Sequence, residues 1–354
     1  MADGAQPLAD VLQIAPNDHP PFGDILTIYQ RALTSLGARV ETLVLAPARG
    51  TPVSDCTYLN LTDLGDVRGA GRRVREAVSG SPRLALCHRY RAYRVLRASG
   101  LAVPRKVAIA HEFGFFKRFQ RRLERRLFAR DVIFAGVSPA VQAELAEAVP
   151  DPLCLPNALD LETVRQTCLS SADARDRLGI AESDALTIGL VGRLVQKKSP
   201  ELAIEAIRAL VGDQVPVRLL VIGDGPLRGD LEQRAQDLPV TFLGFVPDAK
   251  RLFKALDLLL LTSREVEAFG MVALEAMCAG VPVVAGPTPG PQYVLGSTGF
   301  YYNQREPAEI ADAIRSVVLA RQAGELPDRA GRALERAERE FSVSALARRL
   351  APLV

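Results

Sequence analysis

The sequence predicts an α/β protein of two domains, each built around a parallel sheet. Short apolar runs recur along the chain and end in loops rich in glycine or proline, as buried parallel strands do; residues 186–191 and 256–261 are two examples. The 354 residues also exceed the usual size of one domain. Both halves start with a strand, a loop and a helix, so each is predicted to be Rossmann-like.

Composition narrows the class of protein. Hydrophobic residues make up 48% of the chain, yet no apolar run reaches the length of a transmembrane helix. The first ten residues are small, polar and acidic and do not match a secretory signal. The five cysteines are scattered without a CxxC pair, which is typical of reduced thiols and not of disulfides or metal ligands. We therefore expect a cytoplasmic protein.

Positive charge is concentrated in residues 89–130. This stretch holds 13 Lys or Arg residues and two acids, Glu112 and Glu124, so its balance is +11, whereas the whole chain carries +3. The other residues must then carry −8. One face of the first domain is therefore expected to be strongly positive and to attract an anionic partner.

The first domain is predicted to contain strands at residues 11–15, 40–46, 84–88, 106–111 and 131–137. After the first strand comes a turn-rich loop at residues 16–23, and then a helix that Asp24 would cap and Gly37 would end. Ser138 is expected to cap a later helix that Pro139 starts.

Two of these strands end in histidine, His88 and His111. Open α/β sheets bind ligands at the carboxyl ends of their strands, which favours a functional role for His111. A lone histidine is more often structural, and the sequence leaves these two interpretations of His111 equally open. His88 and His19 are weaker candidates.

A basic amphipathic helix is predicted at residues 115–130. Phe115, Phe119, Leu123 and Leu127 lie four residues apart and would form an apolar stripe. Its flanking cations are Lys117, Arg118, Arg121, Arg122, Arg125 and Arg126. The stripe could pack on the core while the charges are solvated, or the helix could meet an anionic membrane or an anionic acceptor.

The second domain is predicted to begin with a diphosphate-binding loop. Gly192 follows the strand at residues 186–191, and Arg193 and Lys198 precede a helix that Ser199 would cap. Two cations that face a helix N-terminus suit a diphosphate. A solvated basic loop is the alternative.

Two later segments could contact the same ligand. The strand at residues 217–222 leads into a turn, Gly223-Asp224-Gly225-Pro226. The strand at residues 241–246 ends near Phe245, where backbone groups could read a nucleotide base, although a plain edge strand explains this segment equally well. Further strands are expected at residues 281–285 and 299–302, a rigid loop at residues 286–291, and two helices from Pro307.

Two carboxylates, Glu267 and Glu275, enclose seven residues after the strand at residues 256–261. Glu267 would lie in a loop at the carboxyl end of that strand, and Glu275 two turns into the next helix. The helix would open with free backbone N–H groups at Phe269, Gly270 and Met271. The spacing suits the two ends of one extended ligand, although two solvated glutamates on an ordinary strand–loop–helix unit are the alternative.

This stretch resembles the Glu-x7-Glu signature of retaining glycosyltransferases of the GT-B fold, most closely family 4, or group 1. Gly192-Arg193 with Lys198, Gly223-x-Gly225-Pro226, Phe245-Val246 and residues 279–284 match that family's pattern. The resemblance is strong from residue 186 to residue 286 and looser before it. Three positions depart from the family's glycines: the loop with Gly23 lacks a glycine pair, and Ala158 and Ser199 each replace one.

The resemblance implies the GT-B architecture, two Rossmann-like domains with a cleft between them. Residues 1–158 would bind the acceptor and residues 159–335 the nucleotide sugar, with a hinge near residues 153–160. Residues 336–354 would form a helix that crosses back to the first domain.

The resemblance also implies roles for single residues. Arg193 and Lys198 would neutralise the diphosphate. Glu275 would accept the ribose hydroxyls, Glu267 would hold hydroxyls of the transferred sugar, and His111 would lie close to that sugar. The nucleotide site would be completed by Gly223, Phe245, Phe269, Gly270 and Met271. The donor would be a UDP-linked sugar, bound as a substrate; no separate cofactor is expected and, because the chain lacks Asp-x-Asp, no metal.

We therefore expect a retaining, metal-independent hexosyltransferase that acts in cell-envelope polysaccharide or lipopolysaccharide assembly. Its acceptor would be a glycan or a lipid-linked, phosphorylated molecule, and residues 89–130 would attach it to the inner face of the plasma membrane. No nucleic acid is expected as a partner. The alternatives are a nucleotide-sugar epimerase or hydrolase on the same scaffold, and a non-catalytic protein that binds an anionic glycan or membrane.

Overall fold

The computed structural model describes residues 10–48, 52–128, 131–181 and 183–354. Contacts divide the chain into two compact units. Unit 1 comprises residues 1–159 and 340–354, and unit 2 comprises residues 160–339. The sequence predicts the corresponding boundaries after residues 158 and 335.

Unit 1 is built on a parallel sheet of seven described strands in the order β3-β2-β1-β4-β5-β6-β7. The strands are β1 (Asp10–Ala15), β2 (Arg39–Val44), β3 (Cys56–Tyr58), β4 (Leu84–His88), β5 (Arg105–Ala110), β6 (Val132–Gly136) and β7 (Leu153–Cys154). The predicted strands are confirmed, whereas β3 and β7 are too short to give a sequence signal. The strand order reverses between β1 and β4, which is where such sheets bind ligands.

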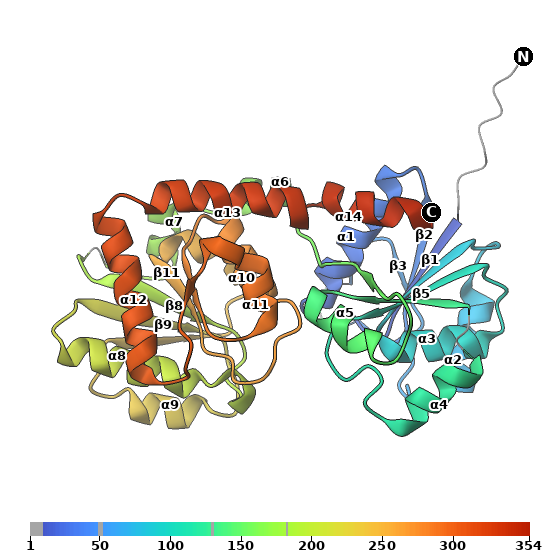
Figure 1. Cartoon of the computed structure of the whole chain (residues 1–354), viewed down its shortest axis with the longest axis horizontal. Coiled ribbons are helices and arrows are strands. Elements are labelled where there is room, and N and C mark those ends of the chain that lie inside the picture. The colour runs from blue at the N-terminus through green and yellow to red at the C-terminus, as the bar shows by residue number, and fades with distance from the viewer. Residues whose placement is uncertain (1–9, 49–51, 129–130, 182) are drawn as a thin grey trace, which may run out of the picture. The chain divides into compact units, whose positions relative to one another are not determined.

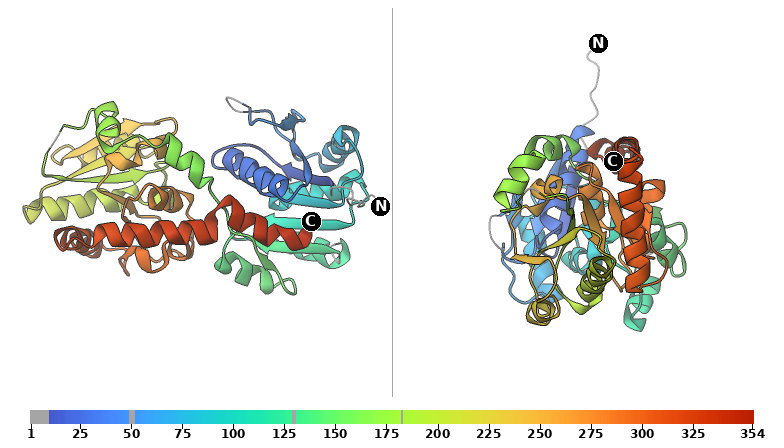
Figure 2. Two further views of the ribbon diagram at one scale, coloured as in Figure 1. Left: turned by 90° about the horizontal axis from the view of Figure 1, so that it is seen from above. Right: turned by 90° about the vertical axis from the view of Figure 1, so that its left-hand side faces the viewer.

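Helices lie on both faces of this sheet (Figures 1 and 2). They are α1 (Phe22–Ser35), α2 (Val67–Ala77), α3 (Arg89–Ser99), α4 (Phe119–Phe128), α5 (Pro139–Ala146) and α14 (Val343–Leu350). The C-terminal helix α14 packs against α1 (Figure 1). Leu159 donates its backbone N–H to the carbonyl of Phe341 at 2.8 Å, so the two chain segments that leave and re-enter unit 1 run side by side.

The starts of two helices test the predicted caps. Ser138 caps α5 as predicted, because its Oγ accepts a hydrogen bond from the N–H of Val141 at 3.3 Å. Asp24 does not cap α1, and that prediction is wrong. The helix already begins at Phe22, with Pro21 at its N-cap, so Asp24 lies in the first turn.

The predicted basic helix is shorter than residues 115–130. It begins at Phe119, because Phe115 and Phe116 are drawn into the core and stack edge-on against Tyr90 and Phe134, with ring centroids 5.3 and 5.1 Å apart. Residues 129 and 130 of the prediction lie outside the described residues.

Unit 2 contains a second parallel sheet, with six described strands in the order β10-β9-β8-β11-β12-β13. They are β8 (Leu186–Val191), β9 (Val217–Ile222), β10 (Val240–Gly244), β11 (Leu258–Leu261), β12 (Val283–Ala285) and β13 (Phe300–Tyr301). The order reverses between β8 and β11, so unit 2 repeats the Rossmann-like pattern predicted for both halves.

The helices of unit 2 are α6 (Leu161–Thr167), α7 (Ser171–Arg177), α8 (Pro200–Gly212), α9 (Arg228–Arg234), α10 (Met271–Cys278), α11 (Pro289–Leu295), α12 (Pro307–Gln322) and most of α13 (Leu326–Phe341). Their apolar faces and the inner strands form one core, to which Ile188, Ile207 and Ile314 contribute fully buried side chains. The sequence predicts a loop throughout residues 286–291, and this prediction is wrong for the second half of the segment. Pro289 starts α11 there, at a position that proline favours.

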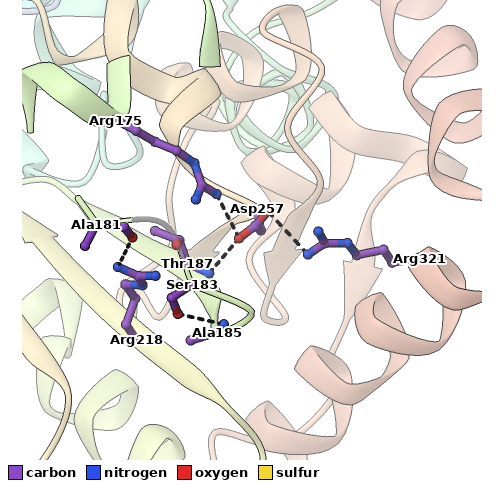
Figure 3. A network of polar contacts seen from close by, with 8 residues as sticks. All are labelled: Arg175, Ala181, Ser183, Ala185, Thr187, Arg218, Asp257 and Arg321. Atoms are coloured by element: carbon purple, nitrogen blue, oxygen red, sulfur yellow. Dashed lines mark hydrogen bonds and ion pairs between the residues drawn. The ribbon is translucent and has the colours of Figure 1, made fainter. Parts of the chain in front are cut away.

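A polar network fastens the amino-terminal edge of this sheet (Figure 3). The carboxylate of Asp257 accepts the backbone N–H of Thr187 at 2.7 Å and pairs with Arg175 at 3.3 Å and Arg321 at 3.4 Å. Strand β8, helix α7 and helix α12 are thereby joined at one side chain. Thr187 and Asp257 lie where β8 and β11 begin, so the network leaves the carboxyl ends of these strands available for a site.

Two further findings concern the described part of the chain. None of its helices is both long and apolar enough to cross a bilayer. All five cysteines are free thiols, as predicted.

Candidate functional site

Two loops of unit 2 lock together at the carboxyl ends of β8 and β9. The N–H of Leu194 donates to the carbonyl of Asp224 at 2.9 Å, and the N–H of Gly223 donates to the carbonyl of Gly244 at 2.7 Å. A Cβ atom on Gly223 would lie 1.9 Å from the carbonyl oxygen of Gly192, so no residue with a side chain fits there. The packing of Gly192 against Gly223 and the hydrogen bond of Leu194 to Asp224 together fix the backbone on both sides of Arg193.

Lys198 and Glu267 meet in this region. Lys198 ends the short helix η1 (Gln196–Lys198), and its Nζ lies 3.0 Å from Glu267 Oε2. Ser263 Oγ donates to the same carboxylate oxygen at 3.2 Å, and Thr262 Oγ1 donates to the carbonyl of Lys198 at 2.9 Å. The sequence nominated both residues but did not predict that they pair.

These residues share one pocket with the predicted phosphate loop. The pocket is lined by Gly192, Arg193, Lys198, Ser263 and Glu267, among others. Arg193 is exposed at its rim and has no ion pair among the described residues. The pocket therefore combines a free guanidinium, an ammonium and a carboxylate, the groups needed to hold an anion at one end and hydroxyls at the other.

Ser199 occupies the N-cap position of α8, as predicted, but its side chain does not cap the helix. Its Oγ donates instead to the carbonyl of Gln196 at 3.3 Å, and its backbone is left-handed, with φ of 43°. A side chain in this conformation is strained, which explains why the resembled family usually has glycine here.

The loop that carries Glu267 is held by the start of α11. The N–H of Gly290 donates to the carbonyl of Glu267 at 3.0 Å, and a Cβ on Gly290 would lie 2.4 Å from that oxygen. Gly270 occupies the N-cap of α10, next to the buried Phe269 and Met271. Glu275 lies one turn after Met271 and not two turns into the helix, because α10 begins only at Met271.

Phe245 follows β10, which is the edge strand of the sheet, and its side chain is 75% exposed. The hydrogen bond between Gly223 and Gly244 brings the turn after β9 next to this strand end. The structure therefore gathers Gly223, Phe245 and the predicted phosphate loop at the carboxyl ends of β8, β9 and β10. Glu275, on α10, is not among the residues that line the pocket with Arg193, Lys198 and Glu267.

A second pocket lies within unit 1, where β1, β4 and β5 end. Its volume is about 260 Å³, and its lining includes the cations Arg89, Arg91 and Arg121 together with His111 and Glu112. All of these residues belong to the strongly basic stretch. The predicted concentration of positive charge therefore surrounds a cavity as well as covering a surface.

Arg89 is held in an unusual conformation at this pocket. It follows β4 directly with a left-handed φ of 72°, and its guanidinium lies over the ring of Phe22 at 4.1 Å from the centroid. Its Nε is buried without a hydrogen-bond partner among the described residues. Strained residues persist where the surrounding structure holds them, and they cluster at binding sites.

His111 lines this pocket and also ends a buried polar chain. Its Nε2 lies 2.9 Å from Nδ1 of His88, whose Nε2 lies 3.1 Å from Oε1 of Gln13. Burial lowers the pKa of His88 to about 3, and burial followed by the nearby His88 lowers the pKa of His111 well below 6.5. Sequence reasoning missed Gln13, although a glutamine inside the apolar strand 11–15 was a signal.

Helix α4 presents its apolar stripe outward. Phe119, Leu123 and Leu127 are 78%, 46% and 60% exposed, so the interpretation that the stripe packs on the core is wrong for these three residues and holds only for Phe115, which lies before the helix. The helix is fastened by polar groups instead: Arg121 and Arg122 each donate to a backbone carbonyl, of Phe115 and Phe116, at 3.0 Å. Glu124 accepts a hydrogen bond from the Tyr90 hydroxyl.

Part of the chain is similar to known proteins. Residues 185–319 match the family model described as Glycosyl transferases group 1. The chain is 28% identical over 266 residues to the GDP-mannose-dependent alpha-(1-6)-phosphatidylinositol dimannoside mannosyltransferase of Mycobacterium tuberculosis, which covers 73% of this chain and 65% of that protein. It is 34% identical over 187 residues to the D-inositol 3-phosphate glycosyltransferase of Geodermatophilus obscurus, covering 48% and 41%. The matches thus span less than two thirds of either relative.

Solved structures share the fold of the whole chain. A glycosyltransferase from Rickettsia africae has a TM-score of 0.82 at 14% identity and covers 98% of each chain. Anabaena HepE in complex with UDP and glucose has a TM-score of 0.77 at 22% identity and covers 97% of this chain and 98% of that one. At these identities the likeness establishes the fold alone, and it confirms the architecture predicted from the sequence.

Proposed function

We propose that this chain, which has the GT-B fold and matches the group 1 glycosyltransferase model over residues 185–319, transfers a sugar from a nucleoside-diphosphate sugar with retention of configuration. One observation carries the proposal. Lys198 and Glu267 pair at 3.0 Å in the pocket that Arg193 borders, so the groups for a diphosphate and for sugar hydroxyls are adjacent.

In the proposed reaction, unit 2 contributes mainly by stabilising charge and by positioning the donor. As the bond from the sugar to the diphosphate breaks, negative charge grows on the leaving group, and Arg193 and Lys198 would stabilise it. The acceptor oxygen would attack the same face of the sugar and give its proton to the departing phosphate oxygen. Glu267 would hold hydroxyls of the sugar, Glu275 would hold the ribose, and N–H groups at the start of α10 would assist. We place the neutralising charge on these side chains and not on a metal ion.

The donor nucleotide is proposed to be UDP, as expected from the sequence. The related mannosyltransferase is named for GDP-mannose, and HepE was solved with UDP, so both bases belong in the first experiment. A thermal-shift screen of UDP- and GDP-sugars identifies the donor, and turnover of that donor is then followed with and without acceptors. Acceptor-dependent turnover supports transfer. Equal turnover without any acceptor, or conversion of the donor to an isomer, would favour the hydrolase or the epimerase instead.

For the acceptor we propose a phosphorylated or lipid-linked molecule that binds the basic pocket of unit 1. Arg89, Arg91 and Arg121 supply cations around a cavity of about 260 Å³, which suits an anionic group. The names of two relatives point the same way, since one acts on a phosphatidylinositol dimannoside and the other on D-inositol 3-phosphate. Assembly of cell-envelope polysaccharide or lipopolysaccharide would use such an acceptor.

We further propose that α4 docks the protein on the inner face of the plasma membrane. Its exposed Phe119, Leu123 and Leu127 could enter the interfacial layer of the bilayer, while neighbouring exposed Arg118 and Arg126 meet anionic headgroups. The same exposed stripe is what a non-catalytic membrane-binding protein would need. The pocket with Arg193, Lys198 and Glu267 favours an enzyme that attaches to a membrane.

A further inference from the structure

Glu267 receives two hydrogen bonds at the same oxygen of its carboxylate. Lys198 Nζ lies 3.0 Å from Glu267 Oε2, and Ser263 Oγ lies 3.2 Å from the same atom. The other oxygen, Oε1, has no hydrogen-bond partner among the residues that the structure describes. Because an ionised carboxylate only accepts hydrogen bonds, Oε1 is the oxygen left for a hydroxyl of a ligand in this pocket.

The two donors to Glu267 differ in how firmly they are held. Ser263 is 6% exposed and comes two residues after Leu261, the last residue of β11, whose carbonyl accepts a hydrogen bond from the Tyr302 hydroxyl at 2.9 Å. Between them, Thr262 Oγ1 donates to the carbonyl of Lys198 at 2.9 Å. The short side chain of Ser263 thus starts from a fixed backbone, whereas the ammonium of Lys198 lies at the end of a long side chain that is 35% exposed.

The backbone of Glu267 is anchored independently of both donors. Its carbonyl accepts the N–H of Gly290 at 3.0 Å, and Gly290 belongs to α11. The Cα of Glu267 and the hydroxyl of Ser263 are therefore held from opposite sides of the loop. The freedom that remains is rotation of the Glu267 side chain among its staggered rotamers, and a hydrogen bond to Ser263 selects one of them.

We propose that Ser263 is a positioning residue, which keeps the Glu267 carboxylate in place after Lys198 has turned to the diphosphate. Ser263 then occupies Oε2, and Oε1 stays available to the hydroxyls of the transferred sugar. Ser263 is neutral and does not compete for the diphosphate as an ammonium does. That the ligand is a nucleoside-diphosphate sugar rests on the proposed function. That Ser263 holds Glu267 without the help of Lys198 does not.

Crystal structures of ligand-free variants test this holding without any substrate. Lys198→Ala removes the ammonium, as donor binding would, and leaves Ser263 in place. We expect one defined Glu267 rotamer in this variant, with Oε2 within hydrogen-bond distance of Ser263 Oγ. In the double variant Lys198→Ala with Ser263→Ala we expect Glu267 in more than one rotamer. A carboxylate that leaves Ser263 in the single variant, or that keeps its rotamer in the double variant, overturns the proposal.

Steady-state kinetics measures the consequence for transfer. Ser263→Ala should lower kcat/KM roughly tenfold, because a hydrogen bond to a charged group is lost. Ser263→Thr keeps the hydroxyl and should recover most of that loss. The Kd of UDP or GDP should stay unchanged, since Glu267 would hold only the sugar. Ser316→Ala is the matched control, because the Ser316 hydroxyl donates to the carbonyl of Asp312 on the exposed face of α12.

A double-mutant cycle shows whether Ser263 acts through Glu267. In single-turnover measurements, Ser263→Ala should cost roughly twofold or less in a Glu267→Ala background, which has no carboxylate to position. The same tenfold loss in both backgrounds would mean that Ser263 supports the pocket in another way, and the proposal would be wrong. If Ser263→Ala does not fold, the ligand-free Lys198→Ala structure still decides. Ligand-free structures that behave as expected in a protein that glycosylates no acceptor would refute the proposed function and leave the positioning intact.

Discussion

Lys198 is the residue with two competing partners. Without a donor it pairs with Glu267, and in the proposed reaction it turns to the diphosphate. Both side chains are part exposed, 35% for Lys198 and 21% for Glu267, and pairs in such surroundings contribute about 0–1 kcal/mol. The ion pair is therefore weak enough for a diphosphate to displace it, and it keeps the ammonium near its place of use.

Substitution of the two cations should affect the reaction far more than the fold. Arg193→Ala and Lys198→Ala are each expected to lower kcat/KM, with a loss of about 2–4 kcal/mol in transition-state stabilisation. Each variant removes a charge that acts mainly on the developing diphosphate. Lys197→Ala is the matched control, since Lys197 is an exposed neighbour outside the pocket. Steady-state kinetics on the three variants checks this, and wild-type rates in Arg193→Ala or Lys198→Ala would remove the diphosphate role.

The two carboxylates should separate by ligand. Glu275→Gln is expected to weaken the binding of the free nucleoside diphosphate, because Glu275 would hold its ribose. Glu267→Gln should spare that binding and impair transfer, because Glu267 would hold only the sugar. Calorimetric titration with the nucleoside diphosphate and with the intact donor measures both effects. The opposite pattern would mean that the two ends of the ligand are assigned backwards.

The buried histidines predict how stability depends on pH. Both are neutral in the folded protein, where the pKa of His88 is about 3, whereas both titrate near 6.5 in the unfolded chain. The unfolded chain therefore binds more protons below pH 6.5, so these groups cost no stability above that pH and reduce it as the pH falls toward 3. Between pH 7.5 and pH 5.5 the loss due to His88 should be about 1.4 kcal/mol, and His111 should add to it in the same direction.

Denaturant unfolding at a series of pH values measures this dependence. The slope of the unfolding free energy against pH should correspond to nearly one proton from His88 near pH 5.5, with a further contribution of the same sign from His111, in addition to any carboxylates. A flat profile between pH 7.5 and pH 5.5 would show that the two histidines are not held neutral.

Among the elements, α4 is unusual for a globular protein. Its polar side chains make the contacts to the rest of unit 1, and its apolar side chains are exposed. We expect Phe119→Ser, Leu123→Ser and Leu127→Ser together to reduce binding to anionic vesicles, because burial of these side chains contributes to attachment. Replacing Arg121 and Arg122 would be a poorer test, because both hold backbone carbonyls within unit 1.

Co-sedimentation with anionic and neutral vesicles gives the readout for α4. Leu319→Ser with Val211→Ser is the matched control, because both side chains are exposed, 63% and 38%, on other helices. Binding of the wild type should also weaken as salt rises, because screening shortens the reach of the arginines. If the triple variant sediments like the wild type, the stripe is not the membrane contact.

The elements also show where sequence reasoning succeeds and where it does not. Buried parallel strands such as β8 are predictable because both faces are covered and the apolar run is continuous. The start of α4 was not predictable. Phe115 and Phe116 continue the helical period, but their rings pack against Tyr90 and Phe134 before the helix begins. The start of α1 was also missed, because the helix begins at Phe22, two residues before Asp24.

For the whole molecule, the sequence predicted two Rossmann-like units and most residues at the edge of unit 2. The predicted phosphate loop was recognisable because Gly192, Arg193 and Lys198 stand close together in the sequence just before a helix N-terminus. Two other features could not be recognised from the sequence: the pairing of Lys198 with Glu267, and the polar chain from Gln13 to His111. Each joins residues that are far apart in the sequence. Such contacts depend on how strands are ordered in a sheet, and no local pattern reports that order.

We propose that the chain is a retaining glycosyltransferase, and proton NMR of the anomeric signal during turnover tests this proposal most directly. The donor found in the nucleotide-sugar screen is incubated with enzyme alone and with phosphorylated polyols or lipid-linked saccharides as acceptors. We predict that the donor is consumed appreciably only with an acceptor, and that the new glycoside has the anomeric configuration of the donor. An inverted product, or equal consumption of the donor without any acceptor, would contradict the account.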